Sequence, residues 1–404
     1  MRRHFHCFPG RRGADAARVS CCAALWRTLL VWALLLPAGL AHAEPFVPDR
    51  DDAVVERLRD RPLDQTDREL RRLRAALHRA PEQMPLAIAV AQRCIVIARR
   101  DGDPRYIGYA EAALAPWWRQ SEQPAAVRLL KAILLQNVHQ FAPALDELGR
   151  LLQRDPGNAQ AWLTSASILQ VQGRYDEAGA ACEQLRAIDG AGSYAQACQA
   201  DLEGLRGNPD SAAATLQRLR TENPGLGSWL NLMEAELAER RGATQTARQR
   251  FTLALAEQSD AYTKGAFADF LLDEGDYARV IELLAGSERS DPLLLRLALA
   301  YRARHDARLA GAVSDLQARF DAARLRGDSV HRREEARFEL KLLDRPERAL
   351  PLARANWDVQ KEPADMRILL ESARAAGSQA DVQAVRQFIV RNRISDVRLA
   401  EYLQ

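Results

Sequence analysis

The sequence lacks the motifs that would assign it to a common class of enzyme. Its 404 residues contain no nucleophile elbow of the G-x-S-x-G type, no glycine-rich phosphate loop ending in Gly-Lys, and no H-E-x-x-H motif. These absences leave catalysis without support from the sequence. We therefore expect a protein that is not an enzyme and that binds no cofactor.

Histidine is scarce, with seven residues in the whole chain. The best candidate for a metal site is the set His331, Glu335 and Glu339, whose i, i+4, i+8 spacing places all three on one helix face. The same stretch, HRREEARFEL, carries three arginines and is typical of a solvated, charge-laced helix. We predict no metal site, because these groups would need further ligands from elsewhere in the fold.

The first 43 residues differ from the rest of the chain. They hold six arginines and one acid, Asp15, followed by the apolar run LLVWALLLPAGLA and by AHA before Glu44. A basic start, a short apolar run and an A-x-A site together describe a secretory signal peptide. We expect cleavage after Ala43 and a periplasmic or secreted protein without a stable membrane anchor. An uncleaved anchor helix is the alternative, although Pro37 and Gly39 interrupt the run.

Lysine is rare, with four among the 57 basic residues, whereas alanine is abundant. This bias suggests a GC-rich bacterial genome, which would make the compartment the periplasm. The signal segment holds six of the basic and one of the 54 acidic residues, so the chain without it is close to neutral. No clustered basic face is evident, and we expect no nucleic-acid partner.

The chain repeats itself with a period of about 34 residues. Turn-like residues recur at steps of 34, 34, 35 and 33, and a small residue lies seven places before each. The turn residues are His139, Gly173, Gly207, Gly242 and Gly275, and the small residues are Ala132, Ala166, Ala200, Ala235 and Ala268. The apolar residues between turns follow helical spacing, and strand signals are weak throughout. Each unit is therefore predicted to contain two amphipathic helices.

This pattern resembles the tetratricopeptide repeat (TPR) family. The resemblance rests on the period and on the large, small and turn residues Trp162, Ala166, Gly173, Tyr175 and Ala178. It implies an all-α fold, a right-handed α-solenoid of about eight helix pairs stabilised mainly between neighbours. We expect a signal peptide over residues 1–43, a linker over 44–65, degenerate repeats over 66–124, the regular array over 125–294, and a long helix with degenerate repeats over 295–404.

The resemblance also implies a concave inner face formed by the first helix of each unit. At the family's face positions, three successive units carry an aromatic residue and, seven residues later, an acid. The aromatic residues are Tyr194, Trp229 and Tyr262, the matching acids are Asp201, Glu236 and Asp269, and Glu239 and Asp273 add further acids. Seven residues make about two helical turns, so each aromatic shares a face with its acid. We predict that this face binds a protein or peptide segment carrying basic and apolar side chains.

Two alternatives stay open for these residues. The aromatic rings could pack between helices while the acids form ordinary surface. Alternatively, Asp201, Glu236 and Asp269 could do acid–base work in an enzyme or accessory subunit of cell-envelope polymer metabolism. The scaffold is the leading prediction, although a fold alone does not fix a function.

Three cysteines follow the signal segment: Cys94, Cys182 and Cys198. The repeat register places Cys182 in the second helix of one unit and Cys198 in the first helix of the next, each eight residues from the turn at Gly190. The two would lie at similar height across one helix seam, where an oxidising compartment favours a disulfide. Two reduced core residues are the alternative. Cys94 would be the free thiol.

Overall fold

The computed structural model describes residue 50 and residues 64–120, 122–328 and 330–403. The chain divides into two units, Met1–Pro62 and Leu63–Gln404, and the described helices all belong to the second. The predicted signal peptide lies outside the described residues. Within the described ranges, no helix is long and apolar enough to cross a membrane.

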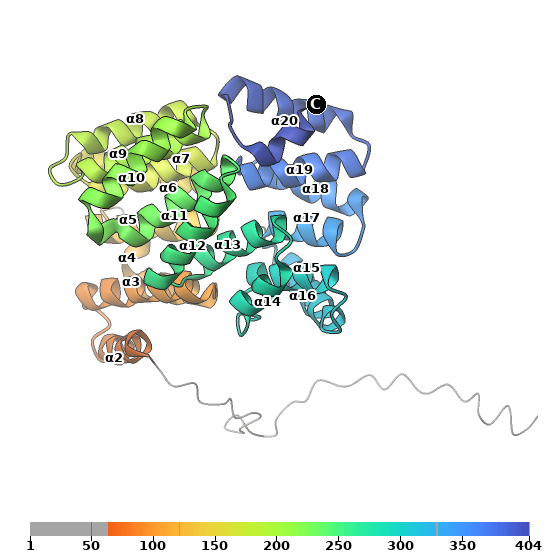
Figure 1. Cartoon of the computed structure of the whole chain (residues 1–404). Coiled ribbons are helices and arrows are strands. Elements are labelled where there is room, and N and C mark those ends of the chain that lie inside the picture. Colours follow the sequence, from red (N-terminus) through yellow and green to blue (C-terminus); the bar gives the residue numbers. More distant parts are fainter. Residues whose placement is uncertain (1–49, 51–63, 121, 329, 404) are drawn as a thin grey trace, which may run out of the picture. The chain divides into compact units, whose positions relative to one another are not determined.

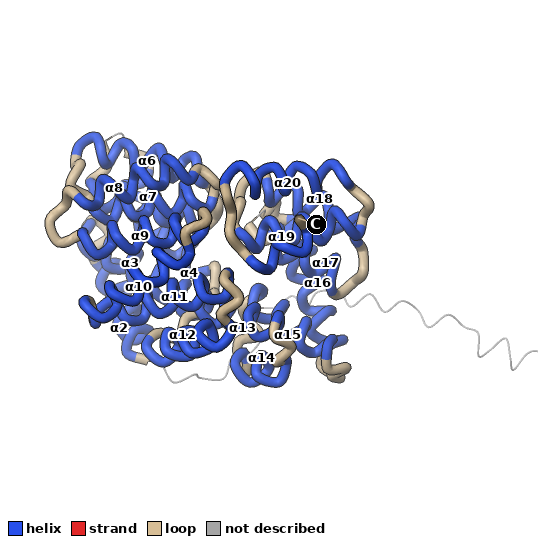
Figure 2. Tube along the Cα trace, turned by 45° about the horizontal axis from the view of Figure 1, so that its top comes forward, coloured by secondary structure: helices blue, strands red, loops and turns tan. Residues whose placement is uncertain are grey.

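Every regular element in the described part of the chain is a helix (Figures 1 and 2), which confirms the predicted all-α solenoid class. The α-helices are α2 (Gln65–Arg79), α3 (Met84–Asp101), α4 (Arg105–Trp118), α5 (Ala125–Asn137), α6 (Phe141–Arg154), α7 (Ala159–Val171), α8 (Tyr175–Arg186), α9 (Gly192–Leu205), α10 (Pro209–Glu222), α11 (Gly227–Arg240), α12 (Thr244–Glu257), α13 (Ala261–Asp273), α14 (Tyr277–Leu284), α15 (Asp291–Ala303), α16 (Leu309–Leu325), α17 (Arg332–Lys341), α18 (Pro346–Trp357), α19 (Pro363–Ala375) and α20 (Gln379–Asn392). Two short 3-10 helices are η1 (Pro224–Leu226) and η2 (Val397–Tyr402).

Helices α3 to α20 form nine successive helix pairs, one more than the sequence indicated. The turn inside each pair contains a residue with positive φ, namely Gly102, His139, Gly173, Gly207, Gly242, Gly275, His305, Asp344 and Gly377. A left-handed residue directly after a helix lets the following amides bind the last free carbonyls, which ends the helix sharply. The recurring turn residues seen in the sequence therefore mark the hinge between the two helices of each pair.

The small residues seven places before the turns are buried in the packed interior of the array. Ala166, Ala200, Ala235 and Ala268 are between 0% and 2% exposed. A methyl side chain at this position allows two helix backbones to approach, and a larger one would have no space in a close-packed interior. The period of small residues in the sequence thus reflects the same need for a small buried side chain in each unit.

Residues 291–325 form two helices, α15 and α16, rather than the single long helix expected there. The interruption is His305, whose φ of 55° ends α15. The amide of Asp306 then donates to the carbonyl oxygen of Tyr301 at 2.9 Å, which closes the turn. The C-terminal part of the chain therefore continues the helix-pair pattern without a break in the architecture.

The array also makes contacts that a chain of nearest neighbours would not make. One hydrophobic core contains buried side chains of α7, α8 and α9 together with side chains of α17 to α20 and η2. Figures 1 and 2 both show α20 beside the α7–α9 region, although about 180 residues separate them in sequence. The expectation of stabilisation mainly between neighbouring repeats is therefore incomplete, because the superhelix closes on itself.

Candidate functional site

The predicted face residues lie on three first helices that stack in succession, α9, α11 and α13. Tyr194 and Asp201 belong to α9. Trp229, Glu236 and Glu239 belong to α11, and Tyr262, Asp269 and Asp273 belong to α13. The predicted residues therefore lie on neighbouring helices. This follows from the repeat register, because equivalent positions of successive first helices lie on the same face of the array.

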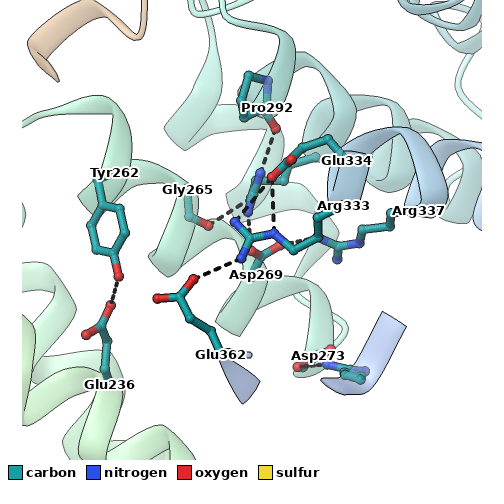
Figure 3. A network of polar contacts seen from close by, with 12 residues as sticks. Glu236, Tyr262, Gly265, Asp269, Asp273, Pro292, Arg333, Glu334, Arg337 and Glu362 are labelled. Carbon is teal, nitrogen blue, oxygen red and sulfur yellow. Dashed lines mark hydrogen bonds and ion pairs between the residues drawn. The ribbon is translucent and has the colours of Figure 1, made fainter. Parts of the chain in front are cut away.

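The aromatic residues form a pair and a separate ring. The Tyr194 ring lies 5.6 Å from the Trp229 ring between centroids, tilted by 32°, and Tyr194 is 36% exposed. Tyr262 is 60% exposed, the larger exposed fraction of the two tyrosines. Its hydroxyl donates a hydrogen bond of 2.8 Å to the Glu236 carboxylate (Figure 3).

Most acids of the predicted row are already held by arginines of the same chain. Asp201 accepts from Arg240 at 3.1 Å and from Gln170 at 2.7 Å. Farther along the row, Arg337 of α17, Arg367 of α19 and Arg398 of η2 reach across from the C-terminal helices. They pair with Asp269 at 2.6 Å, Asp273 at 2.6 Å and Glu239 at 2.7 Å. The predicted acidic row is therefore largely neutralised from within.

Asp269 is the most strongly held of these acids. Burial alone would raise the pKa of this carboxyl, but the guanidinium groups of Arg296 and Arg337 hold it well below its usual range. Glu239 behaves differently, because burial raises its pKa to about 8 despite the neighbouring Arg398. Burial prevails at this carboxyl because only 10% of the Glu239 side chain is accessible to solvent.

Glu236 is the exception in the row. Among the described residues, its carboxylate has the Tyr262 hydroxyl as donor and forms no ion pair. Burial raises the pKa of Glu236, and the charge of Glu236 raises the pKa of Tyr262 well above its usual value. Tyr262 therefore stays protonated and keeps donating its hydrogen bond.

Glu362, at the start of α19, faces the same region from the opposite side (Figure 3). It lies 3.2 Å from Arg333, and 38% of its side chain is accessible. The same guanidinium also pairs with Glu334 at 3.3 Å and with the fully buried Asp365 at 3.4 Å. One arginine thus serves three carboxylates, and negative charge remains in excess there.

The pKa of Glu362 is raised by burial and by the neighbouring carboxylates. Burial and then the charge of Asp365 raise the pKa of Glu362 to about 7, and the charge of Glu236 acts in the same direction. Arg333 opposes these effects. We call Glu236, Tyr262 and Glu362 the acidic corner. Glu362 and the Arg333 cluster carried no signal in the repeat register, because α17 and α19 belong to the degenerate units.

The structure joins Cys182 of α8 to Cys198 of α9 in a disulfide, with 5.7 Å between their Cα atoms. This separation lies in the ordinary range for a disulfide. Cys94 is free and buried in α3, and burial raises the pKa of its thiol to about 11. The bridge therefore spans the seam between two successive units.

The three side chains considered as a metal site in the sequence do not converge on one point, and the two glutamates pair with different arginines. His331 precedes α17 as its N-cap residue, Glu335 pairs with Arg324, and Glu339 lies 3.3 Å from Arg348. In the described ranges, no group of three His, Cys, Asp or Glu side chains could hold a metal ion. The geometry gives no support to the alternative of acid–base catalysis, because Asp201 and Asp269 are each paired with an arginine.

Residues 135–202, from the end of α5 into α9, match the family model for the tetratricopeptide repeat. This segment includes the Gly173 turn and both cysteines of the bridge. No match was found among the curated proteins.

Several solved structures match the chain at low identity. The human IFIT1 dimer with PPP-AAAA is 13% identical, with a TM-score of 0.40 and 84% of each chain covered. Yeast Tom70 is 14% identical, with a TM-score of 0.33, covering 80% of this chain and 61% of that chain. The APC/C hetero-tetramer Cut9-Hcn1 is 15% identical, with a TM-score of 0.36, covering 76% and 52%. Likenesses this distant carry no argument about function.

Proposed function

We propose that this tetratricopeptide-repeat chain is an exported, non-enzymatic scaffold whose inner face binds a protein or peptide segment with basic and apolar side chains. Export is supported by the composition of residues 1–43. The observation that carries the binding proposal is the acidic corner. There a largely exposed tyrosine donates to Glu236 beside a second carboxylate, Glu362, and no arginine fully neutralises either acid.

The chemistry of the acidic corner suits a cationic side chain flanked by apolar groups. An ammonium or guanidinium group would relieve the repulsion between Glu236 and Glu362 and would gain charge-assisted hydrogen bonds. The exposed ring of Tyr262 offers a flat apolar surface and a negative face to the same group. The Tyr194–Trp229 pair, farther along the row, could hold apolar side chains of the same segment.

We expect Glu236→Gln and Tyr262→Ala each to weaken binding of a basic, apolar peptide by about tenfold, because each removes a hot-spot contact. A suitable probe is an acetylated, amidated peptide of alternating arginine and leucine, titrated by fluorescence anisotropy against the full chain. Matched controls are Glu183→Gln, on the exposed face of α8, and Tyr109→Ala, a tyrosine of α4 that is 42% exposed. Equal losses in the controls and the test variants would contradict the proposal.

Binding of the same probe is expected to strengthen as the pH rises from 6 to 8. The pKa of Glu362 is raised to about 7, so this group changes from mostly neutral to mostly charged over that interval. Arginine keeps its charge throughout, and only the ionised carboxylate attracts it. We expect about a three- to tenfold gain in affinity.

The variant Glu362→Gln supplies the control for this pH dependence. It removes one titrating group while keeping a side chain of the same size, so the slope of affinity against pH should become shallower, and the remaining slope belongs to Glu236 and Glu239. A wild-type affinity that falls between pH 6 and 8 would count against a cation site at the acidic corner.

A further inference from the structure

The C-terminal helices lie along one edge of the central repeats. This edge consists of the turn residues of four successive units: His139, Gly173, Gly207 and Gly242. We call it the turn edge. Residues 360–398, which include α19 and α20 and reach into η2, run along it, and we call them the closing segment.

Successive residues of the closing segment lie close to each turn in order. The Gln360 amide lies 3.2 Å from His139 Nδ1, and the aliphatic stem of Lys361 packs close to Gly173. Farther along, a Cβ atom placed on Gly207 would lie 3.6 Å from the Arg393 carbonyl oxygen. A Cβ atom placed on Gly242 would lie 3.5 Å from a methyl group of Val397. The repeat period of the turns is thus matched by successive parts of the closing segment.

Two backbone hydrogen bonds fix the two ends of this contact. The Lys361 amide donates to the Val171 carbonyl oxygen at 2.7 Å, and the Ser395 amide donates to the Leu205 carbonyl oxygen at 2.8 Å. Both acceptors belong to the last turns of first helices, whose carbonyl groups have no partner inside their own helix. These two amides are therefore site-specific reporters of closure.

Ion pairs also join the closing segment to the first helices α11 and α13. Arg367, within the closing segment, pairs with Asp273 of α13, 94 residues away in sequence. Arg398, at its end, pairs with Glu239 of α11. The arginines of the closing segment therefore engage Asp273 and Glu239, two acids of the same row as Glu236. Figure 3 shows Asp273 in one view with the acidic corner.

We propose that the closing segment is an intramolecular occupant of the acidic row, and that an arginine-bearing partner segment competes with Arg367 for Asp273. This inference rests on the proposed function and identifies the partner's chemistry as guanidinium groups, which the chain itself already places there. Occupancy by the partner loosens the closing segment at the turn edge, because the partner's guanidinium group takes the place of Arg367 at Asp273 and removes one of the ion pairs that hold the segment.

The test compares Arg367→Gln with Arg354→Gln in the full chain. Both arginines lie on C-terminal helices and hold one aspartate, but Arg354 pairs with Asp381 of α20 and does not reach α13. We expect Arg367→Gln to bind the arginine–leucine peptide about three- to fivefold more tightly than the wild type, because the competitor is gone. Arg354→Gln should bind it like the wild type.

The variant Asp273→Asn provides a double-mutant comparison, which separates the loss of the Arg367–Asp273 ion pair from a general folding defect. If Arg367 acts through Asp273, then Arg367→Gln gains no affinity when Asp273→Asn is already present. Amide hydrogen exchange gives the second readout. Addition of the peptide to the wild type should speed exchange at Lys361 and Ser395 by about two- to fivefold.

The outcomes separate this inference from the proposed function. Unchanged affinity of Arg367→Gln, with a wild type that binds the peptide through the acidic corner, would overturn the competition alone. Absence of binding by all five proteins, the wild type, the three single variants and the double variant, would overturn both proposals. Tighter binding by Arg367→Gln, lost in the Asp273→Asn background, supports the competition.

Discussion

Replacing Gly173 by alanine is expected to cost about 2–5 kcal/mol of folding free energy, which is more than the same change costs at another turn. The φ of Gly173 is 74°, a conformation that disfavours any side chain. In addition, a Cβ atom there would lie 2.8 Å from Phe388 and 2.9 Å from Lys361. The Phe388 ring has little freedom to move away, because it packs edge-on against Trp357 at 5.0 Å.

The matched control for this change is Gly275→Ala. Gly275 occupies the same position in a later unit with a φ of 73°, and its Cβ would meet no described atom within 4 Å. It should therefore lose only the conformational part, about 1–2 kcal/mol. Denaturant unfolding followed by circular dichroism measures both values. Equal losses at the two glycines would show that the closing segment does not press on the Gly173 turn.

Removing the disulfide is expected to destabilise the folded chain by about 3 kcal/mol, because the bridge closes a loop of modest length in the unfolded state. The variant Cys182→Ala/Cys198→Ala tests this by denaturant unfolding. Both cysteines are nearly inaccessible, so part of the loss would come from the atoms removed. Reduction of the wild type separates the two contributions, since a reductant opens the bridge and leaves the side chains in place.

The double alanine variant also serves as the control for reduction. Dithiothreitol should lower the unfolding midpoint of the wild type and leave that of the variant unchanged. Cys94 is present in both proteins, so its free thiol cannot cause the difference. A wild type whose midpoint does not respond to reductant would mean that the bridge contributes nothing to stability.

These two predictions concern different levels of the same architecture. The bridge between Cys182 and Cys198 joins neighbouring units, as a repeat array would allow anywhere along its length. The Gly173 contact joins units that are distant in sequence, and it gives the array a closed form. A purely linear solenoid would also lose stability on reduction of the bridge. In such a solenoid, however, Gly173→Ala and Gly275→Ala would cost the same folding free energy.

The sequence by itself determined the local architecture. The recurrence of a small residue and a turn residue predicted helix pairs, because each position answers a packing need within one unit. Ala166 must be small where two helices touch, and Gly173 must adopt a positive φ where one helix ends. The same register placed Tyr262 and Glu236 on adjacent first helices, where the structure shows them hydrogen-bonded.

Only the tertiary structure decided what surrounds those residues. Nothing near Asp273 in the sequence indicates Arg367, and nothing near Glu236 indicates Glu362, because these partners meet through the curvature of the whole array. That curvature is the sum of small rotations at each helix seam, and no single repeat encodes it. A periodic sequence therefore specifies its units and their turns, whereas the closure of the superhelix and the charges left unpaired inside it depend on all the units together.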